Sequence, residues 1–402
     1  METADLKSIP SIHKGEISII FATRSRPKNL VKVFSSLRDN TTRKELDHLW
    51  IYVDEDDSVT QQAIESKTLP DPGLQVHWHI ASQTNELGKA LDTLWRVSPR
   101  TSEVYVTTVD DVYFATPGWD EIVRSAFNQY PDGVLLAFPH DPENSLAVTY
   151  AIFGWRWHTT LGCLYIGYFA YWYDDRWVEE IARLAGRLKK LDMTFAPMDN
   201  EKGRTKRMRN LPFWARFMQL TLPERIESAK KLISAMHPQD GPEREAALKN
   251  LEHEAARLRA EQDKFSDIYC VFQEERHSDV APEQRRQFSK LHFACETKAI
   301  QRLISIAQDF MEKKEFAEAM KCLDAVNFSD LRVRQVQEMK AECLRQLGRN
   351  AEAEAILKEN LAAWPEMNFI RRLFRFLGAF ANDGKRMLVG IFGKNPKPTK
   401  PR

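Results

Sequence analysis

The feature that most limits the fold of this chain is a short apolar strand that runs directly into two adjacent acidic residues. Residues Val104–Thr108 are β-branched or aromatic, which is typical of a buried parallel strand. Asp110 and Asp111 follow, and a turn then leads into a helix near Trp119. Ligands of open α/β sheets bind beyond the carboxyl ends of the strands. Two carboxylates there suit a hard divalent cation that carries a diphosphate, although an acidic pair also occurs as a solvated turn that caps a helix.

The same order, an apolar strand followed by polar residues and a helix, recurs along the first half of the chain. Further strands are predicted over Glu16–Thr23, His48–Val53, Leu74–Ile80 and Val134–Phe138. Helical spacing follows the first of them, over Asn29–Leu37. This alternation predicts βαβ units and a parallel, doubly wound α/β sheet. The carboxyl ends of its strands would bring acidic residues and a Thr-Arg turn to one edge.

Composition limits the size and setting of the protein. Its 402 residues are 43% hydrophobic and 29% charged, enough for more than one core, and we expect two domains. The net charge of +1 provides no global field for a polyanion or an acidic membrane. Five cysteines without a C-x-x-C pair indicate free thiols in a reducing compartment. The sequence shows neither a signal segment nor an apolar run of about 18 residues, so we expect a soluble, cytoplasmic protein.

A segment dense in aromatic residues, Tyr150–Trp177, follows the last predicted strand. Aromatic side chains can form a stacking wall for sugar rings or bases, because a ring has an apolar face and a polar edge. The alternative is that the same residues are ordinary core. The segment contains Asp174 and Asp175, which precede a predicted helix with Val178 and Ile181 on its buried side.

Six segments, in this order, resemble the GT-A fold glycosyltransferases, close to glycosyltransferase family 2. They are IIFATRSRP, IYVDEDD, LGKALDTLW, VDDVYFATPGWDEIV, YPDGVLLAFP and YDDRWVEEIARLAGRL, and the resemblance covers roughly residues 16–195. It implies a Rossmann-like nucleotide-sugar-binding domain and an enzyme that transfers a sugar from a nucleotide-sugar donor to a glycan or another hydroxyl acceptor.

The resemblance also implies roles for individual residues. The nucleotide-sugar-binding set would be Thr23, Arg24, Arg26, Asp54, Asp56, Lys89 and Asp110. A divalent cation, Mn²⁺ or Mg²⁺, would lie on Asp111 with help from Asp110. In inverting members of the family a carboxylate acts as general base, and the matching residue is Asp174, with Asp175 as the near alternative.

The last third of the chain has a different, helical pattern. KEFAEAMKCLDAV and RNAEAEAILKENLAAWP align with Ala319 on Ala353, a spacing of 34 residues. This is the tetratricopeptide period, and the resemblance, over roughly residues 297–366, implies a protein partner or self-association. A mere structural buttress is the alternative. A last helix is predicted over Asn368–Phe380. The predicted domains are therefore a GT-A-like domain (1–222), a helical linker region (223–296), all-α tetratricopeptide-like repeats (297–390) and a disordered basic tail (391–402).

Two further functions stay open at this point. The chain differs from the family in that the acidic pair is followed by Val112, and in that the late segment MTFAPMDN lacks a histidine. These differences favour a non-catalytic GT-A-like scaffold that acts through its repeats. A basic stretch, Lys202–Arg216, is compatible with a glycosyltransferase acting on nucleic acid, but the near-neutral total charge does not favour it.

Overall fold

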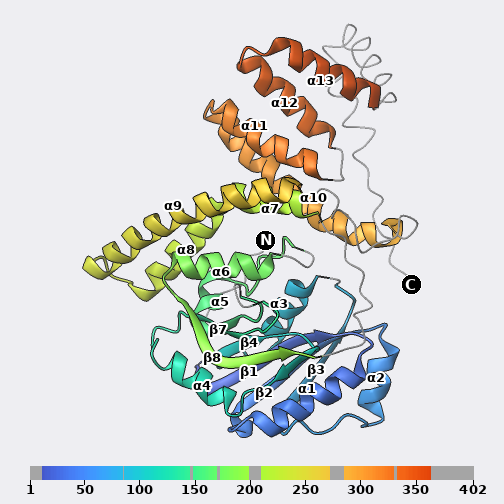
Figure 1. Cartoon of the computed structure of the whole chain (residues 1–402), viewed down its shortest axis with the longest axis vertical. Helices are drawn as coiled ribbons and strands as arrows, with labels where there is room; N and C mark the ends of the chain where they lie inside the picture. Colours follow the sequence, from blue (N-terminus) through green and yellow to red (C-terminus); the bar gives the residue numbers. More distant parts are fainter. Residues whose placement is uncertain are drawn as a thin grey trace, which may run out of the picture. The chain divides into compact units, whose positions relative to one another are not determined.

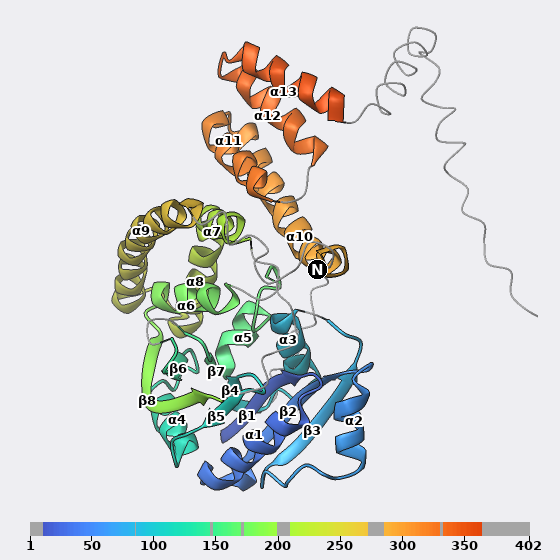
Figure 2. The ribbon, with the colours of Figure 1, turned by 45° about the vertical axis from the view of Figure 1, so that its right-hand side comes forward.

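The computed structural model describes residues 11–84, 86–144, 148–169, 173–198, 210–271, 285–329 and 333–363 (Figures 1 and 2). The chain divides into two compact units. The first consists of Met1–Leu303 with Phe328–Leu331, and the second of Ile304–Asn327 with Arg332–Arg402. The division falls inside one long helix, α10 (Arg285–Glu312).

The first unit is built on a single mixed sheet of eight strands in the order β3-β2-β1-β4-β7-β6-β8-β5. The strands are β1 (His13–Thr23), β2 (Asp47–Asp54), β3 (Gln75–Ala81), β4 (Ser102–Thr107), β5 (Val112–Phe114), β6 (Leu136–His140), β7 (Ile152–Gly154) and β8 (Leu188–Pro197). The first four are mutually parallel. β7 is antiparallel to both β4 and β6, and β5 is antiparallel to β8. β6 pairs with β8 in parallel, and both run in the direction of the first four strands. The expectation of a parallel sheet was therefore wrong for β7 and β5 only.

The register of the parallel strands sets their carboxyl ends side by side. Thr23 is opposite Val53 on β2, and Ile20 is opposite Thr107 on β4. One residue beyond β4, the Thr108 amide still donates to the Ile20 carbonyl at 3.1 Å. Residues that follow β1, β2 and β4 therefore emerge at the same edge, as the sequence predicted.

The helices of the first unit are α1 (Pro27–Asn40), α2 (Ser58–Glu65), α3 (Leu87–Val97), α4 (Trp119–Phe127), α5 (Trp155–Leu161), α6 (Asp174–Leu184), α7 (Leu211–Leu220), α8 (Leu222–Met236), α9 (Pro242–Val271) and the first part of α10. α1, α3, α4, α5 and α6 pack on the sheet through apolar residues that recur at helical spacing, while α7, α8 and α9 pack on α5, α6 and one another. α1 starts with Pro27, whose missing amide costs nothing in a first turn, and buries Leu30, Val33 and Leu37. α3 buries Leu91, Leu94 and Trp95, as predicted.

α6 is held in place by a buried ion pair with the helices that follow. The Glu180 carboxylate accepts bonds of 2.8 Å from Arg225 Nε on α8 and from Gln262 Nε2 on α9. Arg225 is fully buried, and its guanidinium carbon lies 4.6 Å from the centre of the Trp177 ring. A charge so enclosed needs these partners, so the contacts fix the orientation of α6.

The second unit contains α11 (Phe316–Ala325), α12 (Arg334–Gln346) and α13 (Asn350–Ala363). Ala341, Leu344 and Ala353 form its small core. Ala319 and Ala353, which are 34 residues apart, are both fully buried. The tetratricopeptide assignment stays a prediction, and the predicted last helix and basic tail lie outside the described residues.

No helix within the described residues is long and apolar enough to cross a bilayer.

Candidate functional site

Arg24, in the turn after β1, joins the turn to the acidic end of β2. Its Nη1 donates to Asp54 Oδ2 at 2.7 Å and to Asp56 Oδ1 at 2.6 Å, while Nη2 donates to Asp56 Oδ2 at 2.8 Å. The hydrogen bonds from Arg24 lower the pKa of Asp56. Burial raises the pKa of Asp54, against the opposing effect of Arg24. The basic turn and the acids of the second strand therefore lie at the same edge, as the sequence predicted, and they are also paired with each other.

Ser25 bonds the same turn to Asp57, the N-cap residue of α2. Its backbone amide donates to Asp57 Oδ2 at 2.7 Å, and its hydroxyl donates to Oδ1 at 3.1 Å. Asp57 also caps α2 by accepting from the Thr60 amide at 3.1 Å. Ser25 has φ of +54°, an uncommon conformation for a residue with a side chain. Neither Ser25 nor Asp57 was predicted as a site residue, because a helix cap cannot be distinguished within a run of four acidic residues.

Arg26 makes the third link, to the acidic pair after β4. Its guanidinium forms ion pairs with Asp110 Oδ1 and, at 3.2 Å, with Asp111 Oδ2. Thr23 donates its hydroxyl proton to the other Asp110 oxygen at 2.6 Å. Asp110 is fully buried, and burial raises its pKa to about 6 although Arg26 and Thr23 act in the opposite direction. Three consecutive residues thus organise the acids of two strand ends.

The two predicted metal ligands differ in what they offer a cation. Both oxygens of Asp110 are engaged inside the protein, whereas the Asp111 side chain is 42% exposed and pairs with Arg26. Within the described residues there is no cluster of three or more metal-ligating side chains. A nucleotide-bound Mg²⁺ or Mn²⁺ needs only one or two carboxylates besides phosphate oxygens and water. Asp111 therefore fits such an ion as a single protein ligand, and Asp110 fits a supporting role.

Asp174 lies at the first position of α6 in a different environment. Its Oδ1 atom is buried and has no hydrogen-bond partner among the described residues. Its Oδ2 atom lies against α3, only 2.7 Å from the point that a Cβ on Gly88 would occupy. Desolvation raises the pKa of Asp174 well above its ordinary value, and the charges of Asp175 and Glu86 raise it further. A buried carboxylate oxygen without a partner is costly, which marks the position as a functional candidate.

Tyr165 lies against Gly88, as Asp174 does, and also contacts the end of β4. Its hydroxyl lies 2.8 Å from Thr107 Oγ1, and its Cβ is 3.1 Å from the point that a Cβ on Gly88 would occupy. Gly88 is in the first turn of α3, which follows the carboxyl end of β3, so the Asp174 carboxylate lies at the sheet edge that carries the three-residue turn. Gly88 was part of a quoted segment, but the need for a glycine there depends on packing that the sequence does not show.

The remaining predicted residues are less closely engaged. Asp175 accepts from the Arg176 amide at 2.7 Å, and burial raises its pKa to about 6. Lys89 is exposed in the first turn of α3, and no contact among the described residues assigns it to the site. Within the described part of the aromatic segment, Phe153, Trp157, Phe169 and Trp177 are buried at 2% exposure or less. The core alternative therefore describes these rings, while residues 170–172 lie outside the described ranges.

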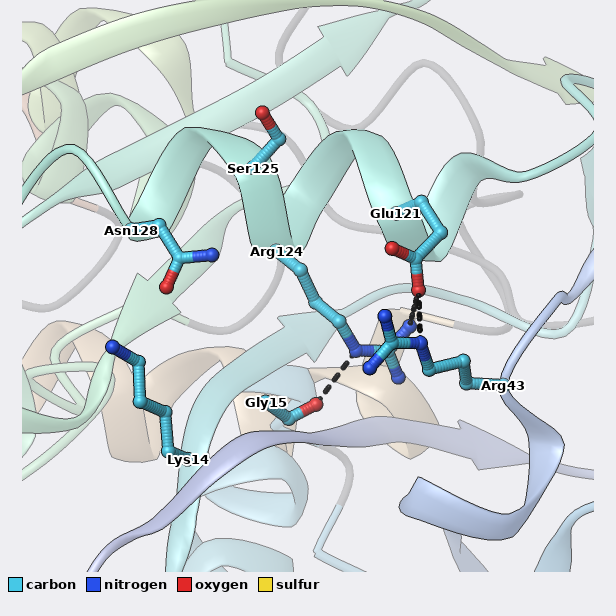
Figure 3. A pocket seen from close by; sticks show the side chains of 7 residues that line it. All are labelled: Lys14, Gly15, Arg43, Glu121, Arg124, Ser125 and Asn128. Carbon is cyan, nitrogen blue, oxygen red and sulfur yellow. Dashed lines mark hydrogen bonds and ion pairs between the residues drawn. The ribbon is translucent and has the colours of Figure 1, made fainter.

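A polar hollow of about 340 Å³ lies near the opposite, amino-terminal edge of the sheet (Figure 3). Figure 3 shows Arg43 and Arg124 converging on Glu121, with Lys14 and Asn128 on the other side. Arg124 Nε donates to the Gly15 carbonyl at 2.7 Å, and its other nitrogens bond Asp47 and Asp120. These contacts join β1, β2 and α4, so the hollow is lined by a structural network and is distant from the predicted site residues.

No family model matches the chain, and no curated protein matches it. Among solved structures it is similar to S. aureus TarS 1–349, with a TM-score of 0.43 and 12% identity over 84% of this chain and 88% of that one. The same TarS fragment in complex with UDP-GlcNAc gives a TM-score of 0.42 and 13% identity, with 84% and 89% covered. The mannosyltransferase PcManGT from Pyrobaculum calidifontis, in complex with GDP-Man and Mn²⁺, gives a TM-score of 0.43 and 12% identity, with 81% and 92% covered. Because these scores are low, function has to be argued from the residues of this chain.

Proposed function

We propose that the first unit is a GT-A-like glycosyltransferase that moves a sugar from a nucleotide-sugar donor to a hydroxyl acceptor. The observation that carries the proposal is the turn at residues 24–26. It holds acids from the ends of β2 and β4 together at the edge of the sheet where Asp174 also lies, with an Oδ1 atom that is buried and has no described partner. Ligands of α/β sheets bind at this edge. A nucleoside diphosphate supplies both the hydroxyls that acids bind and the negative charge that arginines bind.

Each group has a separate part in this mechanism. Asp54 and Asp56, oriented by Arg24, accept hydrogen bonds from the hydroxyls or base of the nucleoside. Arg26, which is 25% exposed beside Asp111, faces the diphosphate with a guanidinium that can make two parallel bonds to it. A divalent cation bound to Asp111 would supply further positive charge for the leaving diphosphate.

Asp174 is the proposed general base. The acceptor oxygen forms a bond to the anomeric carbon while its proton passes to a carboxylate oxygen of Asp174. The bond from that carbon to the diphosphate breaks, and its electron pair leaves with the nucleoside diphosphate. Attack from the face opposite to the leaving group inverts the anomeric configuration. A desolvated carboxylate suits this step, because a raised pKa makes it a stronger proton acceptor near neutral pH.

One observation favours a non-catalytic scaffold as the second candidate. Arg26 already neutralises both acids at the position where the family binds its metal. A chain that had lost catalysis could retain such an internal ion pair as a structural contact. The repeats would then carry the function.

Thermal shift with nucleoside diphosphates and nucleotide sugars, with and without Mn²⁺, tests the proposal. We expect at least one nucleotide to raise Tm in the wild type. Arg24→Met should remove this shift, since the acids at the end of β2 lose their orienting partner. Arg43→Met is a matched control, because Arg43 forms an exposed ion pair with Glu121 at the other edge. A nucleotide shift of equal size in Arg24→Met and the wild type, or none with any nucleotide, would count against the proposal.

A further inference from the structure

A lysine from α10 reaches the first residues of α3, far from it in sequence. Lys298 Nζ lies 3.1 and 3.3 Å from the two carboxylate oxygens of Glu86, and 3.3 Å from the Gly167 carbonyl oxygen. The Glu86 side chain is only 7% exposed, whereas that of Lys298 is 46% exposed. Glu86 is also the N-cap residue of α3, and its carbonyl accepts from the Ala90 amide at 3.1 Å. Lys298 thus links the N-cap residue of α3 to the Gly167 carbonyl, and Asp174 packs against the same helix.

The charges around Asp174 come from three elements. Asp175 neighbours it on α6, Glu86 faces it from the head of α3, and Lys298 faces it from α10. The uncharged titratable groups near it are Tyr165 and Cys163 before α6, and Cys295 on α10. The positive charge of Lys298 lowers the pKa of Asp174, in opposition to the two acids.

We propose that Lys298 is a positioning residue for Asp174, and that α10 thereby completes the active site of the first unit. The inference rests on the proposed function, in which Asp174 is the base. By pairing with Glu86, Lys298 offsets a negative charge that would otherwise oppose ionisation of the base. It also keeps α3, and with it Gly88, in contact with the Asp174 carboxylate.

Lys298 is not alone in joining α10 to other helices of the first unit. Arg302, four residues further along the same helix, donates from Nε to Glu224 of α8 at 2.6 Å. A partly exposed pair such as Lys298 with Glu86 contributes little to stability by itself, on the order of 1 kcal/mol or less. Its specific effect should therefore appear at Asp174, and Arg302→Met provides a control on the same helix.

The first test is a double-mutant cycle in the full chain that needs no activity. It compares Tm for the wild type, Lys298→Met, Asp174→Asn and the double variant across the pH range from acid to weakly alkaline. We expect Lys298→Met to lower Tm more in the wild type than in Asp174→Asn at the alkaline end, because only an ionised Asp174 interacts with the ammonium. This difference should decline as the pH falls and the carboxylate becomes protonated. Arg302→Met should show no such dependence on Asp174, and a Lys298 effect that is identical in both backgrounds would overturn the proposal.

The second test uses transfer by a nucleotide sugar that the wild type accepts. Lys298→Met should lower kcat at neutral pH by about tenfold and move the acid limb of the kcat profile to higher pH, with donor KM unchanged. Lys298→Arg should restore the limb, whereas Arg302→Met should keep the wild-type profile. If the wild type transfers a sugar but the double-mutant cycle shows no coupling between Lys298 and Asp174, only the proposed role of Lys298 is wrong. Coupling without turnover on any donor would overturn the proposed reaction, and with it the role of Lys298 in that reaction.

Discussion

The two ends of the parallel strands both carry buried acids and an arginine, but they differ in how completely the charges are paired. At the amino-terminal edge, Arg124 bonds Asp47, Asp120 and the Gly15 carbonyl, and thereby joins three elements. At the carboxyl edge, Arg24 and Arg26 also bind acids. Each edge contains a buried carboxylate oxygen without a described partner, Asp47 Oδ2 and Asp174 Oδ1. The other Asp47 oxygen is bonded to Arg124, whereas no bond to the Asp174 carboxylate is found among the described residues. The hollow lies at the first edge and the unpaired carboxylate at the second. Pairing therefore distinguishes the proposed site from the structural network better than the shape of the surface does.

The largest effect is expected at the structural edge. Arg124→Met removes the cation between two buried carboxylates, one of which, Asp47, already has its pKa raised to about 7 by burial. Breaking a buried ion pair from one side costs about 3–5 kcal/mol of unfolding free energy, which urea denaturation can measure. Arg43→Met, which removes the exposed partner of Glu121, should cost about 1 kcal/mol or less. Equal losses in the two variants would show that the network at this edge is not the structural element described.

The next effect is expected in catalysis at the opposite edge. Asp174→Asn keeps the shape of the side chain and removes its basicity, so turnover should fall by roughly 100-fold or more while donor binding stays close to that of the wild type. Steady-state kinetics at saturating donor and acceptor measure the loss. Asp175→Asn serves as the neighbouring control, since Asp175 is engaged by the Arg176 amide. Full turnover in Asp174→Asn would place the base elsewhere.

The parts of the fold and of the candidate site that could be predicted are those in which the residues directly follow predicted strands. The turn at residues 24–26 and the acids at residues 54, 56, 110 and 111 follow predicted strands directly, so strand register alone brings them together. β8 was missed because its lysines and Asp192 interrupt the apolar pattern, and β7 because three residues inside an aromatic segment give no periodic signal. Lys298 and Gly88 act on Asp174 through packing between distant helices. No residue pattern near Asp174 indicates either contact.

A smaller effect should separate the two acids after β4. Asp111→Ala should remove the additional nucleotide-dependent rise in Tm that Mn²⁺ provides, and leave the fold intact because its side chain is 42% exposed. Asp110→Ala should instead lower Tm without nucleotide, since Thr23 and Arg26 both lose a buried partner. Thermal shift with nucleoside diphosphate in Mn²⁺ or in excess EDTA distinguishes the two. If EDTA leaves the wild-type shift unchanged, Asp111 holds no metal and Arg26 provides the positive charge alone.

The smallest effect concerns how Tm changes with pH. Its sign tests whether ionised Asp174 destabilises the folded protein. Its pKa is raised in the folded protein, so the folded state binds the proton more tightly than the unfolded chain does. The contribution of Asp174 to stability is therefore least unfavourable below its ordinary pKa and becomes more unfavourable as the pH rises toward the folded value. Asp174→Asn cannot ionise and should escape this loss. Its Tm should exceed that of the wild type at neutral pH by a few degrees or less, and the difference should shrink in acid. A variant that is less stable than the wild type at neutral pH would mean that Asp174 is paired in solution, like the acids at the opposite edge.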